Sequence, residues 1–594
     1  MARFWLGIDI GGTFTDFAVF DTGTGELLGL KVPSTPSDFA EAVRTGLRRL
    51  ADEHGIDPGQ IGAVVHGTTI AVNTLIQRTG ARLGLLVTEG FRDVLELQRL
   101  RLPNPFDLHG ARPLPLVPRA RVAEVRERRC ADGTVDTPLD EANAEAAVRR
   151  LAGHEVEGLV VSLLHAYRDP AHERRVRAIA ERAVPGLPVS TSSEVWPQAR
   201  EYERTALAVL DAYVQPQVRR YLTGFAEALT ARGVPATPHV TKSNGGIMPV
   251  AAAPANTVAT LLSGPACYGR GGTEATLTDA FLVCGFLDAD RFLGGRMPLD
   301  RALAEAAIAR FADRLGMTPS EAAESVVRVA VSNMYAEFTK ILSRAAVDPR
   351  QFALVAFGGA GPVVGALLAR EVGIPAVFVP RSPGTLCALG AISADIVNDA
   401  VRTVHVRLEA TTPTAFDAGA LREPYDALRT ELADWLARHG AGAGPATFRP
   451  AADMRYVGQS YEIEVPVEPA WLAAGGGGAI LTAFHHAHER AFGHADREAP
   501  AEIVNLRVQL RAARPRVPLA EIPAGASPVP RTTRRVWLDR RPTEARVFDR
   551  AALGRGARLV GPVIVEQPDT TVLVPAGHVG DVDRFGNLVL QREG

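Results

Sequence analysis

Residues 6–16 of this chain read Leu-Gly-Ile-Asp-Ile-Gly-Gly-Thr-Phe-Thr-Asp, and the fold is organised around them. An apolar run before Gly11 and a second one after Thr15 predict two strands joined by a glycine turn. Paired glycines let backbone N–H groups approach an anion, and Thr13 adds a hydroxyl donor. Asp9 stands at a strand end, where its carboxylate can hold a hydrated Mg²⁺. The stretch therefore predicts a phosphate-binding hairpin, with an ordinary tight hairpin as the alternative.

The elements after this hairpin follow the order expected of an actin-like ATPase half. Apolar residues at helical spacing predict a helix over 38–52, and 61–65 returns as a short apolar strand. His66 follows at the strand end, and Thr68 or Thr69 can cap the next helix. A helix N-terminus, two hydroxyls and an imidazole thus converge, which favours a functional site. A structural role is the alternative for a single histidine.

Composition narrows the class of protein. With 594 residues, 46% of them hydrophobic, the chain should form three or so globular domains. A formal charge of -2 with dispersed arginines argues against a nucleic-acid partner. No apolar run reaches membrane-spanning length, and the 4 cysteines show no CxxC pairing. We expect a soluble, cytoplasmic protein with no membrane contact.

Two common nucleotide-binding folds do not fit the sequence. Lys31, Lys242 and Lys340 are the only lysines, and none lies in a GxxxxGK[ST] stretch, so a Walker-type site is excluded. The first hairpin does not read GxGxxG, and a strand follows where a dinucleotide-binding fold would start its helix. A Rossmann fold is therefore a weak interpretation.

A second glycine-rich turn occurs later in the chain. Residues 352–357 are apolar and predict a strand, and Gly358, Gly359 and Gly361 follow it before a helix that runs through Glu371. Backbone without side chains beside a helix start permits close approach of adenosine or its α-phosphate. A plain strand-to-helix turn is the alternative.

Motifs over the first two-thirds of the chain resemble the ATP-dependent hydantoinase A and 5-oxoprolinase family, which includes N-methylhydantoinase and acetone carboxylase β-type subunits. In family order, the matching stretches are the 9–16 loop, HGTTIAVNTLIQRTGAR (66–82), TEGFRDVLELQ (88–98), SSEVWPQAREYERT (192–205), SNGG (243–246), LSGPA (262–266), CYGRGGTEATLTD (267–279), AFGGAGP (356–362) and PGTLCAL (383–389). The resemblance implies an α/β fold: an actin-like, ribonuclease-H-type ATPase core with a β-rich α+β C-terminal domain. It also implies a heteromeric complex with a hydantoinase B-type subunit.

The resemblance further implies a reaction. ATP phosphorylates the carbonyl oxygen of a cyclic amide, and water then opens the ring as phosphate leaves, a task that needs positioning and charge neutralisation. The implied residues for ATP and Mg²⁺ are Asp9 (on the metal), Gly11, Gly12, Thr13, Thr15, Gly358, Gly359 and Gly361. The implied residues at the substrate end are His66, Thr68, Thr69 and Asn73. Hydantoin, N-methylhydantoin, 5-oxoproline and a ketone all remain open as substrates.

The chain departs from the family between Ala266 and Cys267. In the family, several tens of residues with a second, DMGGTSTD-like phosphate hairpin separate LSGPA from the next motif, whereas here the two motifs run together. No other Asp-x-Gly-Gly-Thr stretch occurs in the sequence. An actin-like ATPase clamps the γ-phosphate between two hairpins, so we expect weak nucleotide binding and poor turnover. A noncatalytic assembly subunit and an actin-like metabolite kinase are the alternatives.

We expect three parts in the chain. They are an N-terminal actin-like subdomain (1–195), a core subdomain shortened near residue 266 (196–402) and a C-terminal α+β domain (403–594). Alternating residues and short apolar runs in the last part predict a β-rich module for subunit contact, and a homo-oligomer stays open.

Two histidines of the C-terminal part raise the question of a metal site. His485 and His488 share one helix face at i, i+3 spacing, which is a spacing that metal ligands use. No third ligand is fixed by the pattern, so packing or solvated histidines are the favoured interpretation.

Overall fold

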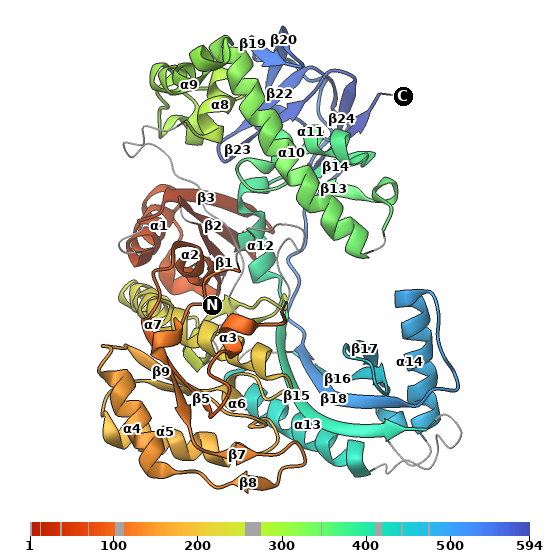
Figure 1. Cartoon of the computed structure of the whole chain (residues 1–594). Helices are drawn as coiled ribbons and strands as arrows, with labels where there is room; N and C mark the ends of the chain where they lie inside the picture. Colours follow the sequence, from red (N-terminus) through yellow and green to blue (C-terminus); the bar gives the residue numbers. More distant parts are fainter. Residues whose placement is uncertain are drawn as a thin grey trace.

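The computed structural model describes residues 3–11, 13–35, 39–68, 70–100, 112–255, 275–345, 347–409, 419–440, 444–472 and 476–593. Gly12, Thr69 and the junction of Ala266 with Cys267 lie outside these described residues. Figure 1 shows an upper body of green and blue elements, a central body that carries the first hairpin, and two lower bodies.

A mixed ten-stranded sheet joins the central body to one lower body, in the order β17-β16-β18-β15-β12-β11-β4-β1-β2-β3 (Figure 1). Its strands are β1 (Phe4–Ile10), β2 (Phe14–Asp21), β3 (Leu27–Pro33), β4 (Ile61–Thr68), β11 (Pro238–Thr241), β12 (Ile247–Pro249), β15 (Ile396–Leu408), β16 (Ala446–Tyr456), β17 (Ile463–Pro466) and β18 (Ala501–Ala512). β1 pairs antiparallel with β2 and parallel with β4, which confirms the predicted hairpin and returning strand.

The core of the central body explains why this strand order is stable. Leu6, Ile8 and Ile10 of β1 are fully buried in one apolar cluster with residues of the helices α1 (Phe39–His54) and α7 (Glu201–Ala231). On the sheet's other face, the short helix α12 (Leu386–Ile392) contacts β1 and β4. Because both faces of β1 are covered, the strand end that carries Asp9 has little freedom to move.

The other lower body is an α/β unit inserted after the helix α2 (Ile70–Gln77). Its sheet has the order β10-β9-β5-β6, and all of its pairs are parallel. The strands are β5 (Leu83–Thr88), β6 (Val122–Val125), β9 (Gly158–Ser162) and β10 (Val189–Thr191), and the helices α4 (Glu141–Ala152) and α5 (Ala171–Ala183) pack beside them.

The upper body combines two distant parts of the chain. Its sheets have the orders β13-β14-β25-β24-β21 and β19-β20-β22-β23. The strands are β13 (Ala353–Val355), β14 (Ala376–Val379), β19 (Thr532–Leu538), β20 (Arg541–Asp549), β21 (Arg558–Val560), β22 (Val563–Gln567), β23 (Thr570–Val574), β24 (His578–Val582) and β25 (Leu588–Arg592). The helices are α8 (Leu277–Val283), α9 (Arg301–Leu315), α10 (Pro319–Ala345) and α11 (Gly361–Val372).

Residues 403–594, expected as one C-terminal domain, contribute strands to two bodies. β16, β17 and β18 extend the central sheet beside β15, whereas β19 to β25 join the helices of the upper body. The physical cause is the burial of apolar side chains. Phe281 and Ile308 of the helices lie in one buried cluster with strand residues, namely Val536, Ile564 and Leu573. The late strands are therefore part of the upper body's core.

The two histidines of the helix α14 (Gly477–Phe492) act as packing residues. His485 and His488 are 5% and 3% exposed. The Nδ1 atom of His485 lies 2.9 Å from the Tyr456 hydroxyl, and the Nδ1 of His488 lies 2.8 Å from the His494 carbonyl oxygen. Among the described residues, no group of three or more histidine, cysteine or acidic side chains could hold a metal ion.

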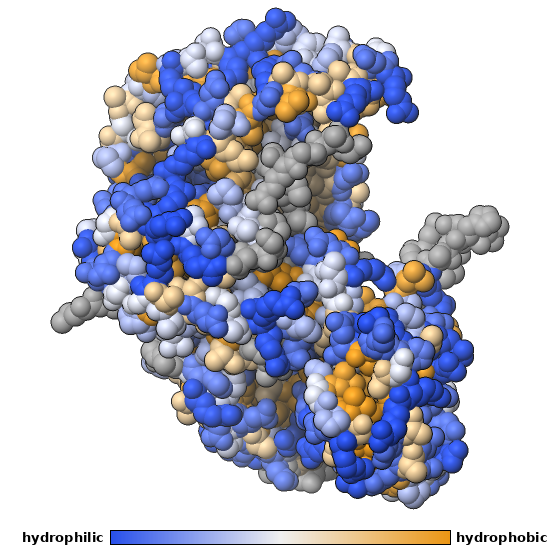
Figure 2. Space-filling view, turned by 90° about the vertical axis from the view of Figure 1, so that its left-hand side faces the viewer, coloured by the Kyte–Doolittle hydropathy of each residue, from blue (hydrophilic) through white to orange (hydrophobic). Residues whose placement is uncertain are grey.

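The surface is mainly polar. Figure 2 shows one face of the molecule covered largely by hydrophilic residues, with apolar ones gathered in separate patches. Within the described parts of the chain, no helix is both long and apolar enough to cross a membrane.

The contact between β1 and α12 should tolerate no added side chain at Gly7. An alanine Cβ there would lie 2.0 Å from the carbonyl oxygen of Ala388. We expect Gly7→Ala to lower the free energy of unfolding by about 2–3 kcal/mol, since overpacking forces the backbone apart. Gly390→Ala on α12 is the matched control, because no atom lies within 4 Å of that Cβ. Gly390→Ala should raise the free energy of unfolding, measured in urea, by about 0.5–1 kcal/mol. Equal effects of the two variants would contradict the close contact between β1 and α12.

Candidate functional site

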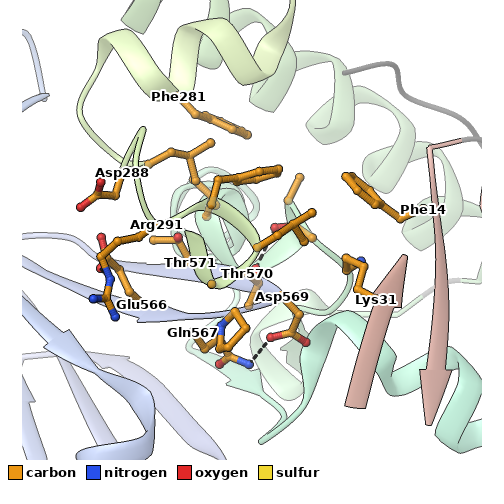
Figure 3. Close-up of a pocket in the computed structure, with 18 of the residues that line it drawn as sticks. Phe14, Lys31, Phe281, Asp288, Arg291, Glu566, Gln567, Asp569, Thr570 and Thr571 are labelled. Atoms are coloured by element: carbon orange, nitrogen blue, oxygen red, sulfur yellow. Dashed lines mark hydrogen bonds and ion pairs between the residues drawn. The ribbon is translucent and has the colours of Figure 1, made fainter. Parts of the chain in front are cut away.

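A cleft of about 270 Å³ separates the central body from the upper body. Figure 3 shows Phe14 and Lys31 on the side of the central body, facing residues of the upper body. The upper body supplies Phe281, Leu287, Asp288, Arg291, Phe292, Leu293, Gly359, Ala360, Val363, Glu566, Gln567, Asp569, Thr570 and Thr571, among others. The rings of Phe14 and Phe292 approach across the cleft, with centroids 6.4 Å apart. The site is thus built from both bodies.

Two carboxylates meet at the closed end of the first hairpin. Asp9 and Asp16 are opposite each other in the β1–β2 register, and Asp16 pairs with the Lys31 ammonium at 2.6 Å. Burial and the charge of Asp16 raise the pKa of Asp9 to about 6, and burial also raises the pKa of Asp16. The Cys387 thiol of α12 donates a hydrogen bond to Asp9. Two buried carboxylates with one nearby lysine favour binding of an added cation.

The residues around Asp9 fit a phosphate with a hydrated magnesium ion. The buried hydroxyl of Thr13 has no hydrogen-bond partner among the described residues, which leaves one donor of the loop unused. Neither Thr13 nor Asp9 is among the residues that line the cleft. Asp9 offers one carboxylate, a donor set that would suit Mg²⁺ because this ion keeps several waters and phosphate oxygens. Gly67 leaves room for that carboxylate: a Cβ there would lie 2.9 Å from Asp9 Oδ1.

Thr15 and Thr68 both make hydrogen bonds within the protein. Thr15 is fully buried, and its hydroxyl lies 3.0 Å from that of Ser34, which in turn donates to the Gly11 carbonyl. The Thr15 hydroxyl is therefore bonded to Ser34, which holds the glycine turn at Gly11. The Thr68 hydroxyl accepts the Ile70 N–H, as expected of a cap on α2.

His66 also differs from the role expected of it. The side chain is fully buried, its Nδ1–H donates to the Ile8 carbonyl at 3.1 Å, and its Nε2 accepts from the Tyr221 hydroxyl at 2.6 Å. Burial lowers the pKa of His66 to about 3, so the ring is neutral. Neither His66 nor Asn73 of α2 lines the cleft. His66 instead connects β4 and α7 to β1, the strand that carries Asp9, which makes it a positioning residue.

The second glycine turn reaches the cleft through Gly359. Its carbonyl accepts the Thr570 hydroxyl at 2.7 Å, while Gly358 has a φ of 79° and donates its N–H to the Pro383 carbonyl. Gly361 is the first residue of α11, whose N-terminus therefore points toward the cleft. Free N–H groups and the positive end of a helix dipole make such a terminus an anion-binding point.

Several residues of the cleft were not predicted. Asp569 belongs to the turn between β22 and β23, where it accepts N–H groups from Gly384 at 2.9 Å and from the Gln567 side chain at 2.6 Å. Its charge contributes to the raised pKa of Asp16, which shows that the upper body presents a carboxylate to the hairpin. Lys31 could have been found, because it is one of three lysines and lies in the strand after the hairpin. Nothing local in the sequence brings Asp569 to residue 16.

Three family models match consecutive parts of the chain. The model "Hydantoinase/oxoprolinase N-terminal region" matches residues 5–184, and "Hydantoinase/oxoprolinase C-terminal domain" matches 411–592. The model "Hydantoinase/oxoprolinase" matches between them in two segments, 204–267 and 263–400, which overlap at the motif junction.

Relatives of this chain include the caprolactamase subunit alpha of Pseudomonas jessenii, which is 29% identical over 97% of this chain and 97% of its own length. That alignment spans 687 positions, so at least 93 of them hold no residue of this 594-residue chain. The acetone carboxylase beta subunit of Xanthobacter autotrophicus is 26% identical, with 96% of both chains covered.

Solved structures agree with the fold. The crystal structure of the ATP-dependent caprolactamase from Pseudomonas jessenii has a TM-score of 0.79 at 27% identity, covering 99% of this chain and 100% of that chain. A nucleotide-free structure of acetone carboxylase has a TM-score of 0.83 at 24% identity and covers 100% of both chains, which shows the shared fold.

The raised pKa of Asp9 predicts a pH-dependent cost to stability. Ionised Asp9 destabilises the fold as the pH rises from its unfolded pKa of about 4 through its folded value, a cost of about 2–3 kcal/mol when complete. We therefore expect Asp9→Asn, without magnesium or nucleotide, to melt at the same temperature as wild type near pH 4 and higher at pH 7.5.

Asp21, at the far end of the same hairpin, is the control for that measurement. Hydrogen bonds from Arg3 hold the pKa of Asp21 below its usual range, so Asp21→Asn should lower the melting temperature at pH 7.5. A gain from Asp9→Asn that is equal at both pH values would contradict the assigned pKa.

The contribution of the His66–Tyr221 hydrogen bond to the free energy of unfolding should be measurable. Tyr221→Phe leaves the buried Nε2 atom of His66 without a donor, which should cost about 1–3 kcal/mol. A double-mutant cycle with His66→Phe should show a coupling of about 1 kcal/mol or more in urea unfolding, and simple additivity would argue against this bond.

Proposed function

This chain belongs to the hydantoinase/oxoprolinase family, and we propose that it is the ATP-using subunit of an enzyme that opens a cyclic amide. One observation carries the proposal: Lys31, which pairs with the hairpin's Asp16 at 2.6 Å, lines one cleft together with Asp569 and with Gly359 and Ala360 at the start of α11. The names of the relatives support it, since one is an ATP-dependent caprolactamase and another is a 5-oxoprolinase of Arabidopsis thaliana.

The cleft offers a place for each part of the nucleotide. Apolar and aromatic side chains of Phe14, Phe281 and Phe292 form a wall suited to an adenine ring. The Thr13 hydroxyl would hold a phosphate oxygen, and Lys31 would neutralise part of the phosphate charge. The expected donor of Gly11 is already used, because the Gly11 N–H donates to the Phe14 carbonyl at 2.9 Å. Asp9 would hold Mg²⁺, which when bound screens the phosphate charge and aligns the γ-phosphoryl group.

The reaction that fits these groups is phosphorylation of the amide carbonyl oxygen. The γ-phosphoryl group passes from ATP to that oxygen, and ADP is left behind. Water adds to the activated carbon, and the ring C–N bond breaks as the nitrogen leaves as an amine. The acyl phosphate that remains is hydrolysed by a second water to a carboxylate and inorganic phosphate. Asp9, Thr13 and Lys31 act on the phosphoryl group only, so the amide is bound elsewhere in the cleft or by a second, hydantoinase B-type subunit.

We also propose that this chain works as one subunit of a heteromeric complex. The relatives carry names of subunits, such as caprolactamase subunit alpha and acetone carboxylase beta subunit. The overlapping family matches at 263–267 favour a second candidate function, that of a nucleotide-binding assembly subunit with poor turnover of its own. Release of ADP that depends on the amide separates the two, because only the first predicts it.

Asp9 should be needed to bind Mg-ATP. In calorimetric titration of the full chain, we expect Asp9→Ala to weaken binding about tenfold or more, because the metal loses its protein ligand. Asp21→Ala is the matched control, since its carboxylate pairs with Arg3 away from the cleft, and it should leave the affinity within about twofold.

The same preparations test the reaction. Lactam-dependent ADP release by the wild-type chain with its partner subunit, lost in Asp9→Ala, would support an amide-opening enzyme. Equal binding of Mg-ATP by Asp9→Ala and wild type would rule out the proposed phosphate site.

A further inference from the structure

The chain passes from the upper body back to the central body through a short turn. Between the end of β14 and the start of α12, Pro383, Gly384 and Thr385 form one helical turn, and all three are buried. Figure 1 shows α12 where the two bodies meet. We call residues 383–387 the crossing turn. They begin the PGTLCAL motif, and the ATP site proposed above uses none of them as a ligand contact.

The first part of the crossing turn holds the upper body. The Gly384 N–H donates to Asp569 Oδ2 at 2.9 Å, and the Pro383 carbonyl accepts the Gly358 N–H at 2.8 Å. The contact with Asp569 is close, because a Cβ at Gly384 would lie 2.4 Å from that same carboxylate oxygen. The crossing turn therefore fixes both the carboxylate of Asp569 and the glycine turn before α11.

The second part of the crossing turn holds the central body. Thr385 packs against β3, since a Cβ at Gly29 would lie 3.3 Å from its methyl carbon. The Cys387 thiol donates its hydrogen bond to the Asp9 carboxylate. Partial burial, together with the charges of Asp9 and Asp16, raises the pKa of this thiol to about 12. The thiol therefore stays protonated near neutral pH and remains a donor.

The charges at this place explain why fixed donors matter. Asp569 acts electrostatically on Asp16, which in turn acts on Asp9, so three carboxylates lie close to Lys31. The charged and titratable groups that act on Asp9 or Asp569 are Asp16, Lys31, Tyr221, Cys387 and Arg550. Without an added cation the carboxylates repel one another, and a side chain without a donor would turn away. A hydrogen bond to each carboxylate opposes that movement.

We propose that the crossing turn is the positioning element of the site: through Gly384 and Cys387 it holds one carboxylate of each body, Asp569 and Asp9, in a single arrangement. Gly384 and Cys387 are positioning residues, because they act on the carboxylates and not on a ligand. A shift of one body against the other must bend this turn or break one of the two contacts. That the arrangement serves Mg-ATP rests on the proposed function, whereas the two contacts do not.

The contact of Cys387 is tested first without nucleotide. Cys387→Ala removes a donor from Asp9, which raises the pKa of Asp9 further and makes its ionisation more costly to the folded state. The melting temperature should therefore fall more at pH 7.5 than at pH 4. This extra fall should vanish in an Asp9→Asn background, which has no charge to lose. Cys387→Ser keeps a hydroxyl donor and should restore the wild-type pH dependence.

The contact of Gly384 is tested by a double-mutant cycle. Gly384→Ala should lower the melting temperature, because its Cβ meets the Asp569 side chain. In an Asp569→Gly background the same change should cost less than half as many degrees. Gly390→Ala, on α12 with no atom within 4 Å of its Cβ, is the matched control and should not lower the melting temperature in either background.

Calorimetric titration of the full chain with Mg-ATP then tests the role of the crossing turn. Since the ionised form of Asp9 binds the metal, Cys387→Ala should weaken binding about threefold or more at pH 6 and by less than about twofold at pH 8.5. Cys387→Ser should restore the wild-type affinity at pH 6.

Each result supports or overturns the proposal. A pH-dependent loss in Cys387→Ala that the serine variant reverses supports it. An equal loss at both pH values, or the same extra loss in the Asp9→Asn background, would overturn it and leave Cys387 as a packing residue. An equal cost of Gly384→Ala with and without the Asp569 side chain would overturn the contact to the upper body. If the melting experiments agree but the wild-type chain binds no Mg-ATP, the contacts stand and only the proposed function fails.

Discussion

The structure depends on keeping two carboxylates, Asp9 and Asp16, close together at the end of one hairpin. Water exclusion and mutual repulsion make this arrangement costly, as the raised pKa of both groups shows. Lys31 offsets part of the charge, and the surrounding backbone is held rigidly in place. Gly7 allows α12 to pack closely against β1, and the His66 ring donates a hydrogen bond to the Ile8 carbonyl of the same strand. Perturbed pKa values of this kind are common at functional sites, and they agree with the cation site proposed above.

The cleft exists because distant parts of the chain form one upper body. α8 to α11 provide the glycine turn and the aromatic wall, while β22 and β23 bring Asp569 and Thr570 to it. These strands follow the helices by about two hundred residues in the sequence, and they share one apolar core with them. Between these two parts, the chain forms β15 to β18 of the central sheet. A chain without the later strands β22 and β23 would therefore lack one side of the cleft.

The two bodies are unequal in a way that bears on function. The central body has a hairpin beside β4, whereas in the part of the chain that the structure describes β13 pairs only with β14. The Asp569 carboxylate already reaches toward the hairpin from the upper body, so the cleft is not without an acidic group on that side.

The sequence by itself determined the first hairpin, the strand after it, the glycine turn before α11 and the family, because these depend on local periodicity and on short motifs. It also identified Asp9 as the acidic residue of the loop. Only the tertiary structure decided that Thr15 and His66 are buried, that Asp569 belongs to the cleft, and that the last strands join the upper body. Burial and the approach of residues some five hundred positions apart follow from how whole sheets and helices pack, which no local pattern encodes.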